Sequence, residues 1–252
     1  MKNLKNTMLI ATLLLATIFT LNAQNQMFSI HADYVKPSME SEYVNASKDF
    51  LQACKKYNLQ NADWTQLRLD NGTYITFEAI PNFAALDINS YAPLVEKMGK
   101  ENFQALLDRF NKCYDRHGSY IVTRIENLTY MPDGARAAQE GQNYRKYHYL
   151  YVTPSTSKMI AEKLKAIKDL YVKKGSKEYY RVYHSGFGTL GEFYLVVISA
   201  KDELSYVKQS DENDALIGEE GKKLLDDLFQ NISRYDPVTG YVLPDLSYTA
   251  TK

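Results

Sequence analysis

Several classes of protein are excluded by what this sequence lacks. After the first segment, no stretch approaches the roughly 18 apolar residues that a membrane-spanning helix needs. Basic and acidic residues are balanced at 30 each, and a chain without a basic excess is poorly suited to nucleic acid or to an anionic membrane surface. We therefore expect neither of these to be its main partner.

Catalytic and cofactor-binding signatures are missing as well. The sequence contains no Gly-x-Ser-x-Gly elbow, no His-Glu-x-x-His, no Gly-Lys-Ser or Gly-Lys-Thr phosphate loop and no Cys-x-x-Cys. Residues Gly186 to Gly191 match the dinucleotide pattern Gly-x-Gly-x-x-Gly, but a β-branched and aromatic stretch follows where a helix should present its N-terminus. We predict a hairpin turn there, and we predict no cofactor.

The N-terminus carries a targeting signal. Lys2 and Lys5 precede the apolar run from Met8 to Leu21, and small or polar residues follow as far as Gln24. This is the pattern of a secretory signal peptide. We expect residues 1–23 to be removed and the mature protein to be exported, to a periplasm or out of the cell, with an uncleaved anchor as the alternative.

The rest of the chain looks like one unit used twice. The stretch His31 to Ser38 (HADYVKPS) returns as His148 to Ser155 (HYLYVTPS), and further matches follow in the same order. The repeat predicts two units of small-domain size, at 27–131 and 146–248. The segment 132–145 between them has few large apolar residues and is predicted to be a linker.

Each unit shows the same order of expected elements. A strand and an amphipathic helix come first, then a hairpin, then a second helix and a last strand. In the first unit the hairpin turns at Asn71-Gly72, because both residues tolerate positive φ. The order β-α-β-β-α-β is the ferredoxin-like arrangement.

A ferredoxin-like unit covers only one face of its sheet with helices, and two such units can cover their open faces by packing sheet to sheet. In this respect the sequence resembles the dimeric α/β-barrel superfamily, with both halves fused in one chain. The resemblance implies an α+β fold, an intrachain barrel and a cavity. The superfamily includes small monooxygenases, isomerase-like enzymes and haem-handling proteins, so the resemblance does not fix a reaction.

A disulfide must be considered for the two cysteines of an exported chain. Cys54 and Cys113 fall on the apolar stripes of two predicted helices, near opposite ends of the expected helical layer. We therefore favour two buried thiols.

Strand alternation predicts which side chains line the cavity, because successive side chains point to opposite faces of a sheet. In the first unit an apolar set that includes Phe28, Ile30, Leu67 and Phe77 is assigned to the helices. The opposite faces of both units are assigned to a small-molecule pocket between the sheets. The predicted ligand-binding residues are His31, Asp33, Trp64, Arg68, Tyr74, Glu78, His148, Tyr180, His184 and Tyr194.

These residues allow two interpretations. The aromatic rings could stack on a flat or sugar-like ligand while the charged groups orient it, or the polar groups could satisfy one another as a network. A metal site from His31, Asp33 and His148 is conceivable, but no further ligand spacing supports it and we predict none. His117 is interpreted as a residue at a helix C-terminus, and His184 as a loop residue or an acid-base group.

Three functions remain open, and with them the question of whether the protein is an enzyme. The leading hypothesis is an exported protein that binds a small molecule. The second is a cofactor-independent monooxygenase- or isomerase-like enzyme, with His31 or His184 transferring a proton and Arg68 holding an anionic oxygen. The third is a structural or partner-binding protein that oligomerises through exposed edge strands.

Overall fold

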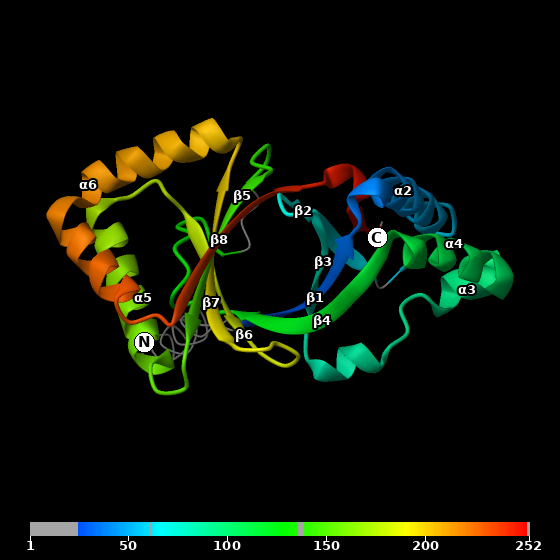
Figure 1. Cartoon of the computed structure of the whole chain (residues 1–252), viewed down its shortest axis with the longest axis horizontal. Helices are drawn as coiled ribbons and strands as arrows, with labels where there is room; N and C mark the ends of the chain where they lie inside the picture. The colour runs from blue at the N-terminus through cyan, green and yellow to red at the C-terminus, as the bar shows by residue number, and fades with distance from the viewer. Residues whose placement is uncertain (1–24, 61, 136–138, 251–252) are drawn as a thin grey trace, which may run out of the picture.

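The computed structural model describes residues 25–60, 62–135 and 139–250 (Figure 1). The predicted signal peptide, 1–23, lies outside the described residues. The elements of the first half are β1 (Gln26–Val35), η1 (Pro37–Met39), α2 (Glu40–Lys56), β2 (Asp63–Leu69), β3 (Thr73–Ile80), η2 (Phe83–Asp87), α3 (Ala92–Met98), α4 (Lys100–Cys113) and β4 (Tyr114–Arg124). The elements of the second half are β5 (Tyr144–Val152), α5 (Ser157–Lys174), β6 (Tyr180–Ser185), β7 (Glu192–Ala200), α6 (Glu203–Phe229), β8 (Arg234–Val242), η3 (Pro244–Leu246) and β9 (Tyr248–Thr249).

The strands close into a barrel. Within the described residues, eight strands follow one another in the order β3-β1-β4-β6-β7-β5-β8-β2, and β2 pairs with β3 to complete the ring. Pairing is antiparallel throughout this ring. Two seams, β4–β6 and β2–β8, join the strands of the first half to those of the second. The expected α+β class and the closed antiparallel barrel are confirmed.

Both predicted hairpin turns form. At the β2–β3 turn, Gly72 has φ of 82° and the Asn71 side chain accepts a hydrogen bond from the Thr73 amide at 3.0 Å. The segment from Gly186 to Gly191 connects the paired strands β6 and β7. A strand, not a helix, follows these glycines, so the geometry of a dinucleotide site is absent there.

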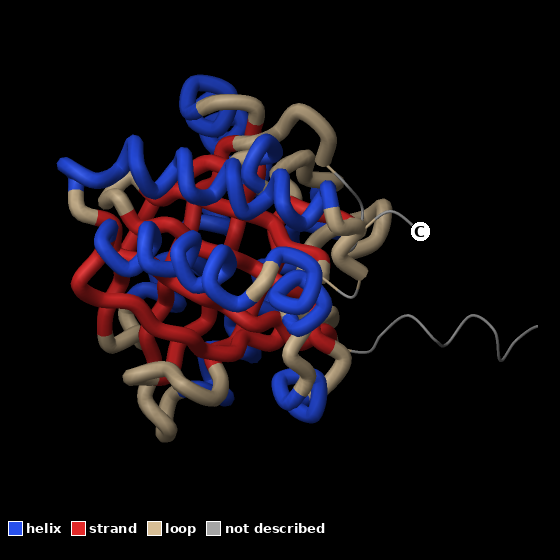
Figure 2. Tube along the Cα trace, turned by 90° about the vertical axis from the view of Figure 1, so that its right-hand side faces the viewer, coloured by secondary structure: helices blue, strands red, loops and turns tan. Residues whose placement is uncertain are grey.

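Helices cover the outside of the barrel on two sides. Figure 1 shows α5 and α6 on one side and α2, α3 and α4 on the other, and Figure 2 shows the long helices lying across the strands. Helix α5 buries Ile160, Leu164, Ile167 and Tyr171, which recur at helical spacing along its sequence. These side chains belong to a core cluster shared with α6 and the outer face of the second-half strands.

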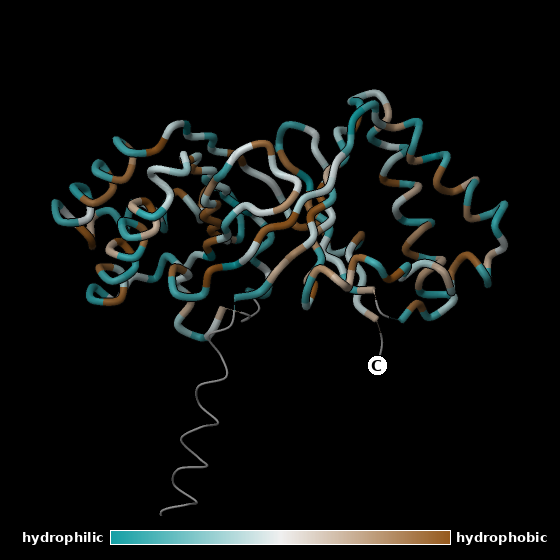
Figure 3. The backbone as a smooth tube through the Cα atoms, turned by 90° about the horizontal axis from the view of Figure 1, so that it is seen from below, coloured by the Kyte–Doolittle hydropathy of each residue, from teal (hydrophilic) through white to brown (hydrophobic). Residues whose placement is uncertain are grey.

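A second apolar cluster lies inside the barrel and draws side chains from both halves. It includes Phe28 and Ile30 of β1 together with Tyr147 of β5 and Leu195 of β7. Figure 3 shows this concentration of hydrophobic residues along the central strands. The barrel interior is therefore a continuous core to which both halves contribute.

Two local predictions were wrong. Helix α4 ends at Cys113 and β4 begins at Tyr114, so His117 lies in a strand and not at a helix end. Strand β5 begins at Tyr144, inside the predicted linker. Helix α6 contains the acidic stretch around Asp211 and is kinked at Gly218, whose φ of 56° is not helical. The Asp202 side chain caps its first turn by accepting from the Ser205 amide at 2.8 Å.

Cys54 and Cys113 are both free and buried, in agreement with the prediction. Burial raises the pKa of the Cys54 thiol to about 12. In the described part of the chain, no helix has the length and apolar character needed to cross a membrane.

Candidate functional site

The two faces of the strands are the reverse of the sequence prediction. Phe28, Ile30, Leu67 and Phe77, which were assigned to the helices, line the barrel interior. The polar set lies outside, where His31, Asp33 and Trp64 share a pocket with residues of α2 and α4. The prediction was wrong because the interior of a small barrel is shielded on every side and takes large apolar groups, whereas the helices supply polar partners to the outer face.

Helix α2 supplies partners to two of the predicted site residues. Arg68 Nε donates to Glu40 Oε1, and the Tyr74 hydroxyl donates to the same oxygen at 3.0 Å. The Arg68 guanidinium holds the pKa of the Glu40 carboxyl below its usual range. Arg68 and Tyr74 therefore tie α2 to the sheet on the outside of the barrel. Glu78 lies on β3, the strand of Tyr74, and burial raises its pKa.

The second-half residues of the predicted site separate into two groups. His184 Nε2 lies 2.9 Å from Glu192 Oε1, and its ring lies 4.6 Å from that of Tyr194. His148 and Tyr180 line a different pocket beneath α5 and α6. The structure therefore distributes the predicted residues over several places outside the barrel, and their role in binding stays a prediction.

The pocket beneath α5 and α6 has a volume of about 190 Å³, and its lining includes Glu178 and His148, whose pKa values are both shifted. Burial raises the pKa of Glu178 to about 7, with Asp214 adding to the effect. Burial lowers the pKa of His148 to about 4. In both side chains the loss of solvation favours the uncharged form. His148 Nδ1 also lies 2.6 Å from the Tyr235 hydroxyl.

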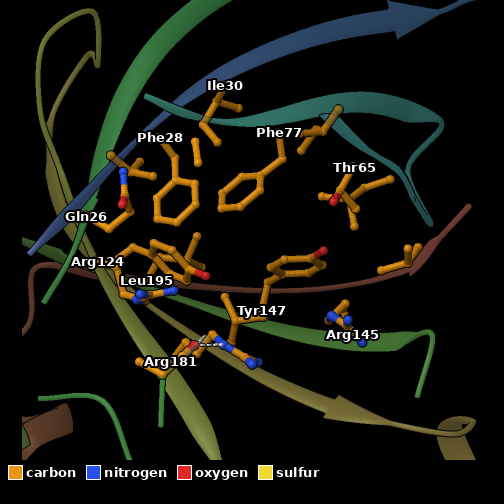
Figure 4. A pocket seen from close by; sticks show the side chains of 18 of the residues that line it. Gln26, Phe28, Ile30, Thr65, Phe77, Arg124, Arg145, Tyr147, Arg181 and Leu195 are labelled. Carbon is orange, nitrogen blue, oxygen red and sulfur yellow. Dashed lines mark hydrogen bonds between the residues drawn. The ribbon is translucent and has the colours of Figure 1, made fainter. Parts of the chain in front are cut away.

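A cavity with a volume of about 610 Å³ lies inside the barrel. Figure 4 shows Phe28 and Phe77 projecting into it from the first half, opposite Tyr147. The Phe28 and Phe77 rings stack with 4.4 Å between their centroids. The polar and aromatic lining residues are Gln26, Asp63, Thr65, Tyr120, Arg124, Gln139, Arg145, Tyr147, Tyr149, Arg181 and Tyr183.

Three arginines reach this cavity, and they differ in their partners. Arg124 is paired with Glu126, its Nη2 lying 2.7 Å from Oε1. Arg181 donates to the Ala135 carbonyl at 2.9 Å and to Gln139 Oε1 at 2.8 Å. Arg145 donates to the backbone carbonyls of Gln142 and Tyr144, and within the described residues no carboxylate forms an ion pair with it.

The arginines also act on one another. Burial lowers the pKa of Arg145, and the positive charge of Arg181 adds to this shift. Burial likewise lowers the pKa of Arg181, with Arg124 contributing. The cavity therefore holds cationic groups that are incompletely solvated and repel one another.

The cavity tyrosines are buried phenols. Burial raises the pKa of Tyr120 to about 12 and raises the pKa of Tyr149 well above its usual value. The Tyr147 hydroxyl is buried and has no hydrogen-bond partner among the described residues. Burial holds the pKa of Tyr147 well above its usual value, so this phenol keeps its proton and can donate it to an acceptor.

The sequence prediction missed Arg124, Arg145, Arg181 and Tyr147. The sequence contains a pattern for part of this set. Arg145 and Tyr147 are two residues apart on β5, and Arg181 lies on β6, the following strand in the sequence. Alternation groups such residues on one face but does not say which face is inward. With the faces reversed, these side chains were not considered.

The barrel and its covering helices define the class of fold, an α+β protein with a closed antiparallel barrel. No protein-family model and no curated protein matches the chain. Among solved structures, an anthrone oxidase-like protein is similar with a TM-score of 0.59 at 11% identity, over 90% of this chain and 94% of that protein. A candidate monooxygenase from Lactobacillus acidophilus NCFM has a TM-score of 0.55 at 10% identity, over 90% of this chain and 97% of its own.

A mutant chlorite dismutase from Candidatus Nitrospira defluvii is also similar, with a TM-score of 0.51 at 7% identity, over 87% of this chain and 92% of its own. At identities this low the likeness establishes the fold alone. The predicted resemblance to monooxygenase-like α/β barrels is confirmed at that level.

Proposed function

We propose that the barrel interior binds a small organic anion with an aromatic or otherwise flat apolar body. The observation that carries the proposal is the pair Arg145 and Arg181, both half-buried in the cavity lining, together with the Tyr147 hydroxyl of the same lining, which has no hydrogen-bond partner in the described part of the chain. A volume of about 610 Å³ is in the range of small-molecule sites, which combine an apolar lining with a few placed polar groups.

The electrostatic part of the argument rests on solvation. Moving a cation out of water costs free energy unless an anion or hydrogen-bond acceptors replace the lost solvation. Burial lowers the pKa of both Arg145 and Arg181, which is the direction expected when a guanidinium is removed from water. A carboxylate, phenolate or sulfonate would offset this cost, and a planar carboxylate can accept two hydrogen bonds from one guanidinium.

The apolar part of the argument rests on the opposite wall. Phe28, Phe77 and Tyr183 pack as an aromatic group, with the Tyr183 ring 5.7 Å and 5.8 Å from the two phenylalanine rings in edge-on contact. Such a wall offers ring faces and edges to a flat ligand. The cavity therefore favours a ligand with a charged end and an aromatic body.

An enzymatic role for the same cavity is the second candidate, favoured by the oxidase and monooxygenase names of two structural neighbours. We infer a cofactor-independent oxidation of an electron-rich phenolic anion, in which the cavity phenols hold the substrate oxygen. Incubation with a hydroxylated anthrone and dioxygen tests it, since conversion of the ring methylene to a carbonyl consumes one O₂ and releases one H₂O. Oxygen uptake no faster than in protein-free buffer would leave binding alone as the function.

Two further proposals concern the whole chain. The basic start, apolar run and small residues of 1–24 support export, and the ordered sequence repeat supports an origin by duplication of a ferredoxin-like unit. Each half of the described chain contains four barrel strands and two long helices in the order that this origin requires. The closed ring of strands leaves less edge for pairing between chains than separate sheets would.

Binding can be tested with two probes of similar shape and different charge, the anionic 1-anilinonaphthalene-8-sulfonate and the neutral N-phenyl-1-naphthylamine. We expect Arg145→Gln to lower the affinity for the anionic probe by about tenfold or more, because one charge-assisted contact is lost. The affinity for the neutral probe should be nearly unchanged. Arg116→Gln, which alters an exposed arginine that lies over Tyr34, serves as the matched control. Equal affinity of wild type and Arg145→Gln for the anionic probe would contradict the proposal.

A further inference from the structure

A cluster outside the barrel brings together three side chains that commonly bind metal ions. His31 and Asp33 lie on β1 and His117 on β4, and one ligand atom of each lies within 4.8 Å of the other two. Strand register produces this arrangement, because Asp33 is paired directly with His117 across the β1–β4 ladder. His31, two residues before Asp33, points to the same face of the sheet.

Neighbouring groups orient two of these side chains. His31 Nδ1 lies 2.8 Å from Ser119 Oγ, which leaves Nε2 directed at Asp33 Oδ1, 3.0 Å away. The other oxygen of Asp33, Oδ2, accepts a hydrogen bond of 2.7 Å from the Tyr43 hydroxyl. Metal sites in proteins are commonly built this way, with one atom of each ligand fixed by an outer partner and the other turned to the ion.

The third side chain completes one side of the cluster. The His117 ring lies 5.3 Å from the His31 ring at an interplanar angle of 61°, and its other neighbour is the Tyr114 ring, also at 5.3 Å. His117 is exposed while Asp33 is buried. The cluster therefore joins a buried anionic oxygen to two imidazoles at the surface.

We propose that His31, Asp33 and His117 bind a divalent first-row transition metal ion, with Zn²⁺ as the ion to test. Two imidazole nitrogens and one carboxylate oxygen form a donor set that suits Zn²⁺ and its neighbours, whereas Mg²⁺ and Ca²⁺ prefer sites made of oxygen alone. Three protein ligands leave a coordination position open, as in metal sites that act on a water or a substrate.

Two of the three residues also line a pocket between the sheet and helices α2 and α4. His31, Asp33 and Tyr114 line that pocket, which has a volume of about 370 Å³. The metal site and the barrel cavity lie on opposite faces of β1, where His31 and Asp33 point outward and Phe28 and Ile30 point inward. The proposal therefore does not depend on the function proposed for the barrel.

Isothermal titration of the EDTA-treated protein with ZnCl₂ tests this site. We expect one Zn²⁺ per chain, and we expect His117→Ala and Asp33→Asn each to lower the affinity by at least about tenfold, the usual scale for losing one protein ligand or its orienting partner. His184→Ala is the matched control, because it removes a histidine that is paired with a carboxylate elsewhere. It is expected to leave Zn²⁺ affinity unchanged.

Thermal unfolding supplies a second readout. An ion that binds only the folded chain raises the midpoint of unfolding by an amount that grows with the logarithm of its concentration relative to Kd. Zn²⁺ should therefore raise the midpoint of wild type and of His184→Ala more than that of His117→Ala. Since His117 is exposed, its replacement should leave the metal-free midpoint nearly unchanged, so the test does not depend on a destabilised variant. The proposal is overturned if Zn²⁺ does not bind, or if it binds equally well to wild type and to His117→Ala.

Discussion

The Tyr43 hydroxyl donates a hydrogen bond of 2.7 Å to Oδ2 of Asp33 and so joins helix α2 to strand β1. Both residues are buried. Burial and the negative charge of Asp33 together raise the pKa of Tyr43 far above its usual value. A carboxylate under a helix needs such a donor, because an ionised group without hydrogen bonds is costly in the interior.

Replacing Tyr43 by phenylalanine should therefore destabilise the fold. The change removes one hydrogen bond to a charged acceptor, and we expect the free energy of unfolding to fall by about 1.5–3 kcal/mol. Urea unfolding followed by circular dichroism measures it. The control is Tyr34→Phe, which alters a half-exposed ring on β1, the strand that carries Asp33. It should change stability little. Equal stability of the two variants would show that the Asp33 carboxylate does not depend on this donor.

The Tyr147 hydroxyl should behave in the opposite way, because it is buried and has no hydrogen-bond partner within the ranges that the structure describes. Tyr147→Phe removes a desolvated polar group, so stability should stay equal or rise by about 1 kcal/mol, while affinity for an anionic ligand in the barrel should fall. The comparison is Tyr130→Phe, a tyrosine equally buried at 6% exposure whose hydroxyl donates to the Ser176 carbonyl at 2.9 Å. That variant should lose about 1 kcal/mol, and a similar loss in Tyr147→Phe would indicate an unrecognised partner.

Closure of the barrel at the β2–β8 seam depends on a glycine. A Cβ at Gly240 would lie 2.6 Å from the Arg68 carbonyl oxygen and 3.1 Å from the Leu69 Cα, and backbone atoms cannot move aside individually. We expect Gly240→Ala to cost about 1–3 kcal/mol of unfolding free energy. Gly118→Ala, in β4, has open space around its Cβ and should be close to neutral. Thermal and urea unfolding measure the stability of both variants. Equal stability would show that the β2–β8 seam has room for a Cβ at Gly240.

Stability should fall with rising pH because of Glu178. Burial raises the pKa of this carboxyl from 4.5 to about 7 in the folded chain. Between these values the unfolded chain releases the proton and the folded chain keeps it, so the folded state binds more protons and the free energy of unfolding decreases as pH rises. The decrease is complete above about pH 7 and amounts to roughly 3 kcal/mol.

Glu178→Gln removes this titration and keeps the side-chain shape. We expect wild type to lose stability relative to the variant between pH 4.5 and 7, measured by urea unfolding at a series of pH values. The Tyr171 hydroxyl, which donates to Glu178 Oε2 at 3.2 Å, can donate to the amide oxygen as well. A stability difference independent of pH would show that Glu178 titrates normally.

The sequence by itself determined the local units and their order. The Asn71-Gly72 turn, the apolar stripe of α5 and the strand and helix order of each half follow from backbone preference and hydrophobic period, which are properties of short stretches. The repeat of the His31 stretch at His148 predicted a chain of two units, and from these units we predicted an α+β barrel. Burial of Cys54 and Cys113 also follows from their helical spacing.

The direction of each strand face was decided only by the tertiary structure. Alternation separates Phe28 and Ile30 from His31 and Asp33, but a half-turn of the strand exchanges inside and outside without changing the pattern. The exchange was settled by partners distant in sequence: Tyr43 and Glu40 of α2 for the polar face, and Tyr147 and Leu195 of the second half for the apolar face. The candidate cavity and the proposed metal cluster therefore depend on strand pairing across the barrel, which no single stretch of sequence contains.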